Sequence, residues 1–176
     1  SYFGKVINAV NLIELNLWMD GEAIDLAQNP PRSYRRELDM KTGVLSREFR
    51  VAAGDGALRV RFERFLSIAR PELLCIRCRV TPERAANVAF EAALDGRVHN
   101  EDANYEETFW LHEAQDACDR KGGYLIERTR ENPVGTPRFA ICAAMQTVRP
   151  CPVTTEARPG RCAQRGEVFL AAGETL

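Results

Sequence analysis

The sequence lacks the features that mark several classes of protein. It has no apolar run near the roughly 20 residues that a membrane-spanning helix needs, and its first ten residues lack the basic and then apolar layout of a signal peptide. No Asn-x-Ser/Thr sequon is present. The basic excess of a nucleic-acid platform is missing too, because 24 basic residues stand against 25 acidic ones. We therefore expect a cytoplasmic protein with neither a membrane nor a nucleic-acid partner.

Cysteine and histidine are too sparse for a disulfide scaffold or a clear metal site. The chain has six cysteines and two histidines in 176 residues, so we expect reduced thiols and no metal. Its one Cys-x-x-Cys, at Cys75 and Cys78, lies in an alternating stretch, where positions three apart face opposite ways. A zinc site needs thiolates that converge on one ion. Cys78 is better explained as a small core residue of a strand.

Helical periodicity is also missing. No stretch sustains an apolar i, i+3, i+4, i+7 pattern for three turns, and only residues 82–86 suggest a turn of helix. Asp-Gly pairs at residues 20–21, 55–56 and 95–96 follow apolar or alternating runs and predict hairpins. We expect strands at residues 12–19, 44–51, 58–69, 73–80, 87–94, 107–111, 124–129, 139–148 and 167–172. The segment 150–166, with three prolines, is expected to be a long loop.

Many short strands with almost no helix predict an all-β fold. Alternation of apolar and polar residues favours antiparallel pairing with one polar face per sheet. We therefore expect residues 1–176 to form a single antiparallel β-sandwich domain. Because the chain stops just after an expected strand, we also expect it to be a fragment of a longer, multidomain protein.

Two expected strands place an arginine on their apolar side. Arg47 alternates in phase with a leucine, a phenylalanine and a valine. Arg64 falls on the inward parity of its strand, unless a β-bulge shifts the register there. A buried guanidinium is stable only when it is paired and hydrogen-bonded, so we expect an internal clamp from Arg47 to Asp39 or Glu37. Direct binding of a ligand by Arg47 is the alternative.

Both tryptophans alternate in phase with polar neighbours. Trp18 shares parity with Glu14 and Asn16, and Trp110 with His112. Outward aromatic rings could stack on a sugar or pack against another domain or a second subunit, where an amphipathic ring suits a partly wet interface. We expect Trp18 and Trp110 to be contact residues of one of these kinds.

No residue pattern predicts catalysis within the chain. The acidic pairs at residues 101–102 and 106–107 are sequence neighbours, which diverge on a strand instead of flanking a substrate. Glycoside cleavage needs a general acid and an attacking group on opposite sides of the bond. Residues 54–56 form a hairpin turn and not a phosphate-binding loop. We expect no catalytic residue and no cofactor here.

Three stretches of the sequence resemble the N-terminal domain of glycoside hydrolase family 65. The first pattern consists of Leu38, Asp39, Met40, Gly43, Leu45 and Arg47. The second consists of Arg64, Phe65 and Ser67. The third consists of Asn8, Asn11, Asp20, Gly21 and Glu22, with Val10 and Leu12 where the family has proline and tryptophan. The resemblance covers residues 6–96, with a weaker echo at 169–176.

The resemblance implies a β-supersandwich like that of galactose mutarotases. Family members include maltose, trehalose, kojibiose and nigerose phosphorylases and some hydrolases, and their general acid and phosphate site lie in an (α/α)6 barrel that follows the sandwich. The chain would then be a non-catalytic domain, truncated at both ends, that supports the barrel of an inverting disaccharide phosphorylase or hydrolase. The implied partners are that barrel, a disaccharide, inorganic phosphate as co-substrate and a second subunit. A stand-alone carbohydrate-binding or protein-interaction sandwich is the alternative.

Overall fold

The computed structural model describes residues 6–100, 108–118, 122–132, 135–148 and 151–176. These residues form twelve strands and no helix, which confirms the all-β fold class. The strands are β1 (Asn11–Met19), β2 (Glu22–Ala23), β3 (Ser33–Asp39), β4 (Val44–Ala53), β5 (Gly56–Leu66), β6 (Leu74–Pro82), β7 (Ala86–Asp95), β8 (Trp110–Cys118), β9 (Gly122–Thr129), β10 (Ala140–Gln146), β11 (Val153–Arg158) and β12 (Arg161–Leu170). Since the described part of the chain is free of helix, it holds no helix that could span a membrane.

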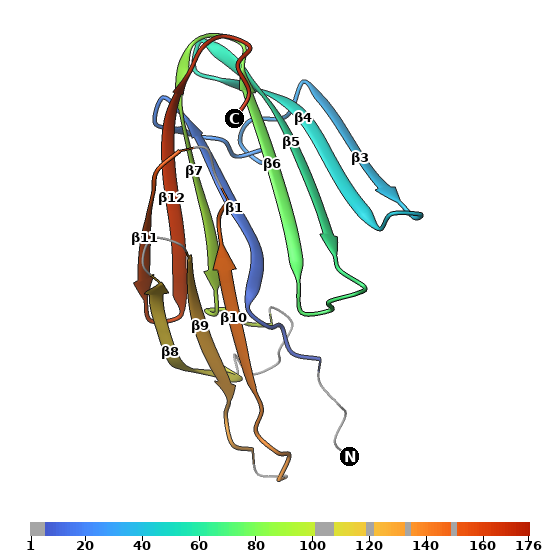
Figure 1. The fold of residues 1–176 in the computed structure, drawn as a ribbon, viewed down its shortest axis with the longest axis vertical. Helices are drawn as coiled ribbons and strands as arrows, with labels where there is room; N and C mark the ends of the chain where they lie inside the picture. Colours follow the sequence, from blue (N-terminus) through green and yellow to red (C-terminus); the bar gives the residue numbers. More distant parts are fainter. Residues whose placement is uncertain (1–5, 101–107, 119–121, 133–134, 149–150) are drawn as a thin grey trace. The chain divides into compact units, whose positions relative to one another are not determined.

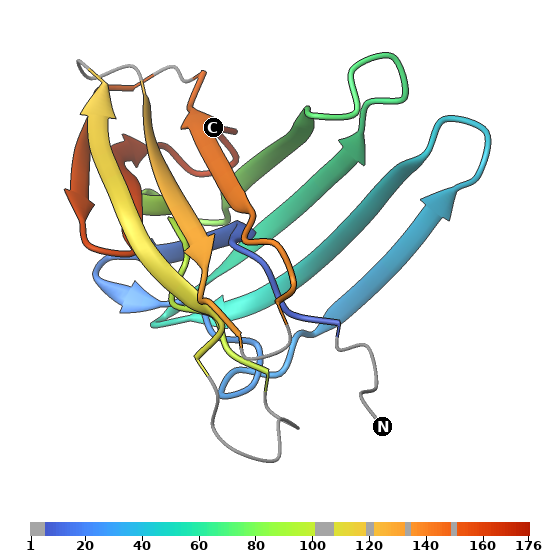
Figure 2. The same ribbon diagram turned by 90° about the horizontal axis from the view of Figure 1, so that it is seen from below.

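The strands form three sheets (Figure 1). One has four strands in the order β3-β4-β5-β6, and a second has three in the order β10-β9-β8; both are antiparallel throughout. The third has five strands in the order β11-β12-β7-β1-β2. Figure 2 shows the strands of the three-stranded sheet side by side, coloured yellow to orange.

Contacts within the chain define two compact units. Unit 1 contains residues 1–15 and 91–166, and unit 2 contains residues 16–90 and 167–176. Strands β1, β7 and β12 contribute residues to both.

Unit 2 contains the four-stranded sheet, in which tight turns join β3 to β4 and β4 to β5, while residues 67–73 connect β5 to β6. The β3–β4 turn ends at Gly43 and the β4–β5 turn contains Gly54, and both glycines have positive φ, a conformation that costs glycine little. The core of this sheet consists of Val51, Leu58, Val60 and Val80, all buried. The last residues of the chain lie along β6, where the Val80 amide donates to the Leu176 carbonyl at 3.1 Å and the Leu176 amide donates back at 3.0 Å.

Unit 1 contains the three-stranded sheet, and β9 is its central strand. Leu125 of β9 is fully buried and forms a cluster with Val10, Leu94 and Ala143. The strand begins with Gly122 and Gly123 because neighbouring atoms leave no room for a side chain. A Cβ on Gly123 would lie 2.2 Å from the Sγ of Cys162. Glycine is therefore required by close packing at this position and not by a special φ.

The structure corrects several expected elements. Residues 150–166 are not one long loop, because they include β11 and the start of β12, joined by a turn at Gly160 with a φ of 73°. Strand β3 was not expected at all, and β8 extends well past residue 111. Residues 82–86 form no helix, since Pro82 closes β6 and Ala86 opens β7.

Candidate functional site

The residues expected to form the clamp lie in unit 2, and the structure does not bring them together. Asp39 ends β3 and caps the following turn, accepting hydrogen bonds from the Lys41 amide at 2.9 Å and the Thr42 hydroxyl at 2.8 Å. These bonds, the one from the Thr42 hydroxyl first, lower the pKa of Asp39. Glu37, the other expected partner, pairs with Arg35 at 2.5 Å.

Arg47 lies against two aromatic rings. Its guanidinium carbon is 4.6 Å from the ring centroid of Phe62 and 5.5 Å from that of Phe49. A cation over an aromatic face is attracted by the ring quadrupole. Arg47, the last residue of the first sequence pattern, is therefore stabilised by cation–π contacts. These contacts explain how its guanidinium can lie among apolar neighbours.

Arg64 lies on the same face of the sheet as Arg47. The register through β5 is continuous, pairing Arg64 with Leu45 on one side and Ile76 on the other, so the expected alternative of a bulge is excluded. Arg64 is half-buried. No carboxylate among the described residues lies within ion-pair distance of it. Cys78 shares this face while Cys75 lies on the other, and burial raises the pKa of the Cys78 thiol to about 12.

A buried arginine–carboxylate cluster does exist, in unit 1 and at residues that sequence reasoning missed. Arg161 is 7% exposed, and its Nη2 donates to Glu14 Oε1 at 2.7 Å and to Glu91 Oε1 at 2.6 Å. Burial lowers the pKa of Arg161, but the two carboxylates outweigh it and raise the pKa above its ordinary value. The sequence contains one indication of this cluster, because Glu91 interrupts an otherwise apolar run in an expected strand.

Trp110 is buried instead of exposed. Only 6% of it is accessible, its Nε1 donates to the Asn8 carbonyl at 2.6 Å, and it packs edge-on against Phe139. Its parity misled the prediction because the polar side chains that share it, such as His112, also point inward. Trp18 in β1 is half-buried and stays a candidate contact residue.

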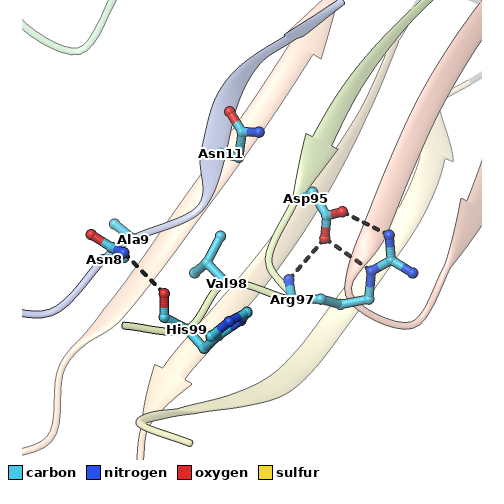
Figure 3. Close-up of a pocket in the computed structure, with 7 residues that line it drawn as sticks. All are labelled: Asn8, Ala9, Asn11, Asp95, Arg97, Val98 and His99. Atoms are coloured by element: carbon cyan, nitrogen blue, oxygen red, sulfur yellow. Dashed lines mark hydrogen bonds and ion pairs between the residues drawn. The ribbon is translucent and has the colours of Figure 1, made fainter. Parts of the chain in front are cut away.

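Unit 1 also contains a pocket of 460 Å³ beside the N-terminal segment (Figure 3). Its lining residues are Asn8, Ala9, Asn11, Asp95, Arg97, Val98 and His99. Asn8 and Asn11 belong to the third sequence pattern above. Figure 3 shows the Asn8 side chain directed at the His99 carbonyl, to which its Nδ2 donates at 3.0 Å.

The ionised groups of this pocket are already paired. Arg97 donates to Asp95 through Nε at 2.9 Å and Nη2 at 2.7 Å, and this pairing lowers the pKa of Asp95. Among the described residues, Asp95 is the single carboxylate that lines the pocket. Glycoside cleavage by paired carboxyl groups needs two of them about 5–9.5 Å apart. The described pocket therefore offers polar contacts but no acid–base pair.

His112 of β8 is another titratable residue of unit 1, and it contacts two side-chain acceptors. Its Nδ1 lies 2.8 Å from Oε1 of Glu127, which is 2% exposed, and its Nε2 contacts Oε1 of Gln115. Burial lowers the pKa of His112, but the hydrogen bonds to Glu127 and Gln115 outweigh it and raise the pKa. Because both ring nitrogens face acceptors, this arrangement favours the imidazolium.

Comparisons with known proteins identify the family. The model of the glycosyl hydrolase family 65 N-terminal domain matches residues 1–176. The chain therefore belongs to this family and is the N-terminal domain of a family 65 protein, as the sequence motifs predicted.

Curated relatives include the maltose phosphorylase of Bacillus subtilis, 48% identical over 145 residues, which are 82% of this chain and 19% of that protein. A kojibiose phosphorylase of Thermoanaerobacter brockii is 29% identical over 126 residues, covering 70% of this chain and 16% of the relative. This chain thus spans about a fifth of the length of such relatives.

A solved structure supports the fold. A putative kojibiose phosphorylase from the human microbiome superimposes with a TM-score of 0.84 over 97% of this chain and 21% of its own, at 16% identity. The likeness confirms the antiparallel β-sandwich class.

Proposed function

We propose that the chain is the non-catalytic N-terminal sandwich of a disaccharide phosphorylase that acts on α-linked glucose disaccharides. The observation that carries the proposal is the match of the family model to residues 1–176, together with 48% identity to a maltose phosphorylase. The catalytic groups would lie in the barrel that follows in the same polypeptide. The described part of this chain supports that division, because its pocket holds one carboxylate and that carboxylate is paired with Arg97.

In this role the domain supports the barrel and shapes the mouth of its site. Phosphate would be the co-substrate, attacking the sugar from the face opposite to the general acid. The free thiols of Cys75, Cys78, Cys142 and Cys151 fit a reducing compartment, and we include action in the cytoplasm in the proposal.

The test is an assay of the family-length polypeptide with maltose, kojibiose and trehalose, with and without phosphate. We expect phosphate-dependent release of glucose 1-phosphate from at least one of them, with maltose as the first candidate. Release of glucose without phosphate would identify a hydrolase instead and contradict the proposal.

The 176-residue chain assayed alone is the matched control, and we expect no turnover from it. Turnover by this chain would show that catalytic groups lie within it. Isothermal titration of the same chain with the three sugars tests the remaining alternative, a stand-alone carbohydrate-binding module. Millimolar or tighter binding would favour a carbohydrate-binding module over a supporting domain.

A further inference from the structure

Charge is segregated along the chain. Residues 32–84, which include the four-stranded sheet of unit 2, carry 13 basic and seven acidic residues. The rest of the chain carries 11 basic and 18 acidic residues, so a near-neutral total conceals a basic sheet. Such a local excess indicates a partner of the opposite charge.

The two faces of this sheet differ in how their arginines are neutralised. On one face, which we call the carboxylate face, Glu63 pairs with Arg61 and Arg79 at 3.1 Å and with Arg77 at 3.6 Å. Arg35 and Glu37 form a further pair there. The arginines of the carboxylate face are thus largely compensated by neighbours on the same face.

The other face, which we call the arginine face, has no acidic residue among the described strand positions of β3 to β6. The register places on its outer part Tyr34, Arg36, Leu38, Leu45, Arg47, Phe62, Arg64, Leu66, Leu74 and Ile76. Arg36 lies directly opposite Arg47, and Arg64 lies one diagonal step away. Among the described residues, neither Arg36 nor Arg64 has a carboxylate within ion-pair distance.

The arginine face is also apolar and open. Leu38 is 52% exposed and Leu66 is 68% exposed, while Tyr34 and Ile76 of the same face are exposed as well. Exposed apolar side chains gathered on one surface and mixed with arginine are typical of the core of a protein–protein interface. Strand β3, which forms the outer edge of this sheet in Figure 1, is exposed along its whole length.

We propose that the arginine face is a docking surface for the remainder of a family-length polypeptide, which presents carboxylates to Arg36 and Arg64. This inference rests on the proposed function. The maltose phosphorylase is about five times as long as its matched region, since the 145 matched residues are 19% of it. That extra chain provides an occupant that is tethered to the domain and needs no separate association step.

A second copy of the chain is a poor occupant for the same surface. A symmetric dimer places the same patch on both sides of the interface. The arginine face would then meet itself and bring six guanidinium groups together without an acidic residue between them. Like charges across an interface are strongly unfavourable, so the complementary surface must carry carboxylates.

Cysteine labelling tests the proposal. Leu38→Cys introduces a thiol on the arginine face, and the native Cys75, exposed on the carboxylate face, serves as the internal reference. In the 176-residue chain we expect iodoacetamide to label both sites at similar rates. In the family-length polypeptide we expect labelling at position 38 to slow at least about ten-fold relative to Cys75, as for a buried interface residue.

A charge-reversal pair shows whether the arginines hold the contact. Adding Arg36→Glu and Arg64→Glu to the family-length protein should restore labelling at position 38. The two new glutamates would then face the carboxylates of the rest of the polypeptide and repel them. The matched control, Arg35→Glu with Arg77→Glu on the carboxylate face, should leave position 38 protected. Protection of the buried Cys151 from labelling would show that each variant is folded.

Three results would overturn the proposal. Equal labelling of position 38 in both proteins would show that the rest of the polypeptide does not cover this face. At low salt of about 0.05 M, where charge repulsion is least screened, protection in the 176-residue chain that grows with its concentration would assign the face to a second copy. Persistent protection in the Arg36→Glu, Arg64→Glu protein would remove the arginines from the contact. The phosphorolysis assay on the same protein tests the proposed function separately, since protection without phosphorolysis would contradict that function alone.

Discussion

Arg161 and Arg47 are both arginines at inward positions, and the chain stabilises them differently. Arg161 donates to two carboxylates, whereas Arg47 lies over two phenylalanine rings. In the first arrangement one buried cation is shared by two carboxylates, and replacing it removes a partner from both. The second leaves no orphaned ion when the arginine is replaced. The same residue type should therefore respond very differently to mutation at the two sites.

We expect Arg161→Met to lower the free energy of unfolding by about 3–5 kcal/mol, the usual cost of leaving a buried charge without its partner. Urea unfolding at neutral pH would measure the change. Arg97→Met is the control, because Arg97 makes a more exposed ion pair with Asp95 and should cost about 1 kcal/mol or less. Equal losses in the two variants would contradict the assignment of Arg161 as a buried clamp.

Arg47→Met should change the free energy of unfolding by only about 1 kcal/mol or less. The thioether fills similar space and contacts aromatic rings favourably, while the lost cation–π contact is worth about 0.5–2 kcal/mol. Urea unfolding again provides the measurement. A loss of several kcal/mol would instead indicate that Arg47 has a carboxylate partner, as the sequence first suggested.

His112 should make stability depend on pH in a defined direction. Its pKa is raised in the folded state, so its contribution is fully present below the unfolded value of about 6.5 and is lost as the pH rises through the folded value. Urea midpoints between about pH 5.5 and 8.5 should fall with increasing pH. In the His112→Gln variant, the fall of the urea midpoint that is due to this histidine should disappear. The His99→Gln control should retain that fall.

At the level of elements, the start of β9 is the position where backbone packing is tightest. Gly123→Ala would place a Cβ against the Sγ of Cys162 and 2.9 Å from the Asp116 carbonyl. Overpacking of this kind costs about 1–3 kcal/mol, which thermal unfolding would detect. Gly56→Ala is the control, since its nearest neighbours are the flexible side chains of Arg84 and Met19 at 3.0–3.1 Å, and we expect a smaller loss. A larger loss at Gly56 would contradict this ranking.

The sequence predicted elements well where one face of a strand is apolar and the other polar. Strands β4 to β7 were expected within a few residues of their observed bounds, because alternation and Asp-Gly turns are local signals. Strand β3 escaped prediction because all seven of its residues are exposed and Arg36 lies between Tyr34 and Leu38 on one face, so the sequence shows no clear apolar alternation there. Strand β11 was hidden by flanking prolines, although the Pro159-Gly160 pair marks its turn.

Candidate site residues were predicted less well, because parity shows which residues share a face but not which face is buried. Glu127 and Thr129 of β9 are buried polar residues, and Trp110 shares their side of the sheet. The pairing of Arg161 with Glu14 joins residues 147 positions apart. Contacts of that range depend on the strand order of the sheet, which no local pattern contains.

At the level of the whole molecule, the arginine face should make association depend on salt. In the isolated 176-residue chain, repulsion among Arg36, Arg47 and Arg64 opposes contact between exposed apolar surfaces. Raising the salt from about 0.05 M to 0.5 M screens that repulsion, so sedimentation velocity should show more self-association at high salt. Leu66→Lys should reduce the effect. Association that weakens with salt would indicate ion pairing between copies instead.

The pairing of the C-terminal residues with β6 bears on how the domain is synthesised. Thr81 and Thr175, which share a hydrogen bond at 2.8 Å, are 94 positions apart. At about 5–20 residues per second, a ribosome needs roughly 5–20 seconds to produce the segment that closes this edge. During that interval the backbone groups of β6 stay available to other nascent chains. Chaperone engagement should therefore concentrate in this window of translation, between the emergence of β6 and that of the final four residues.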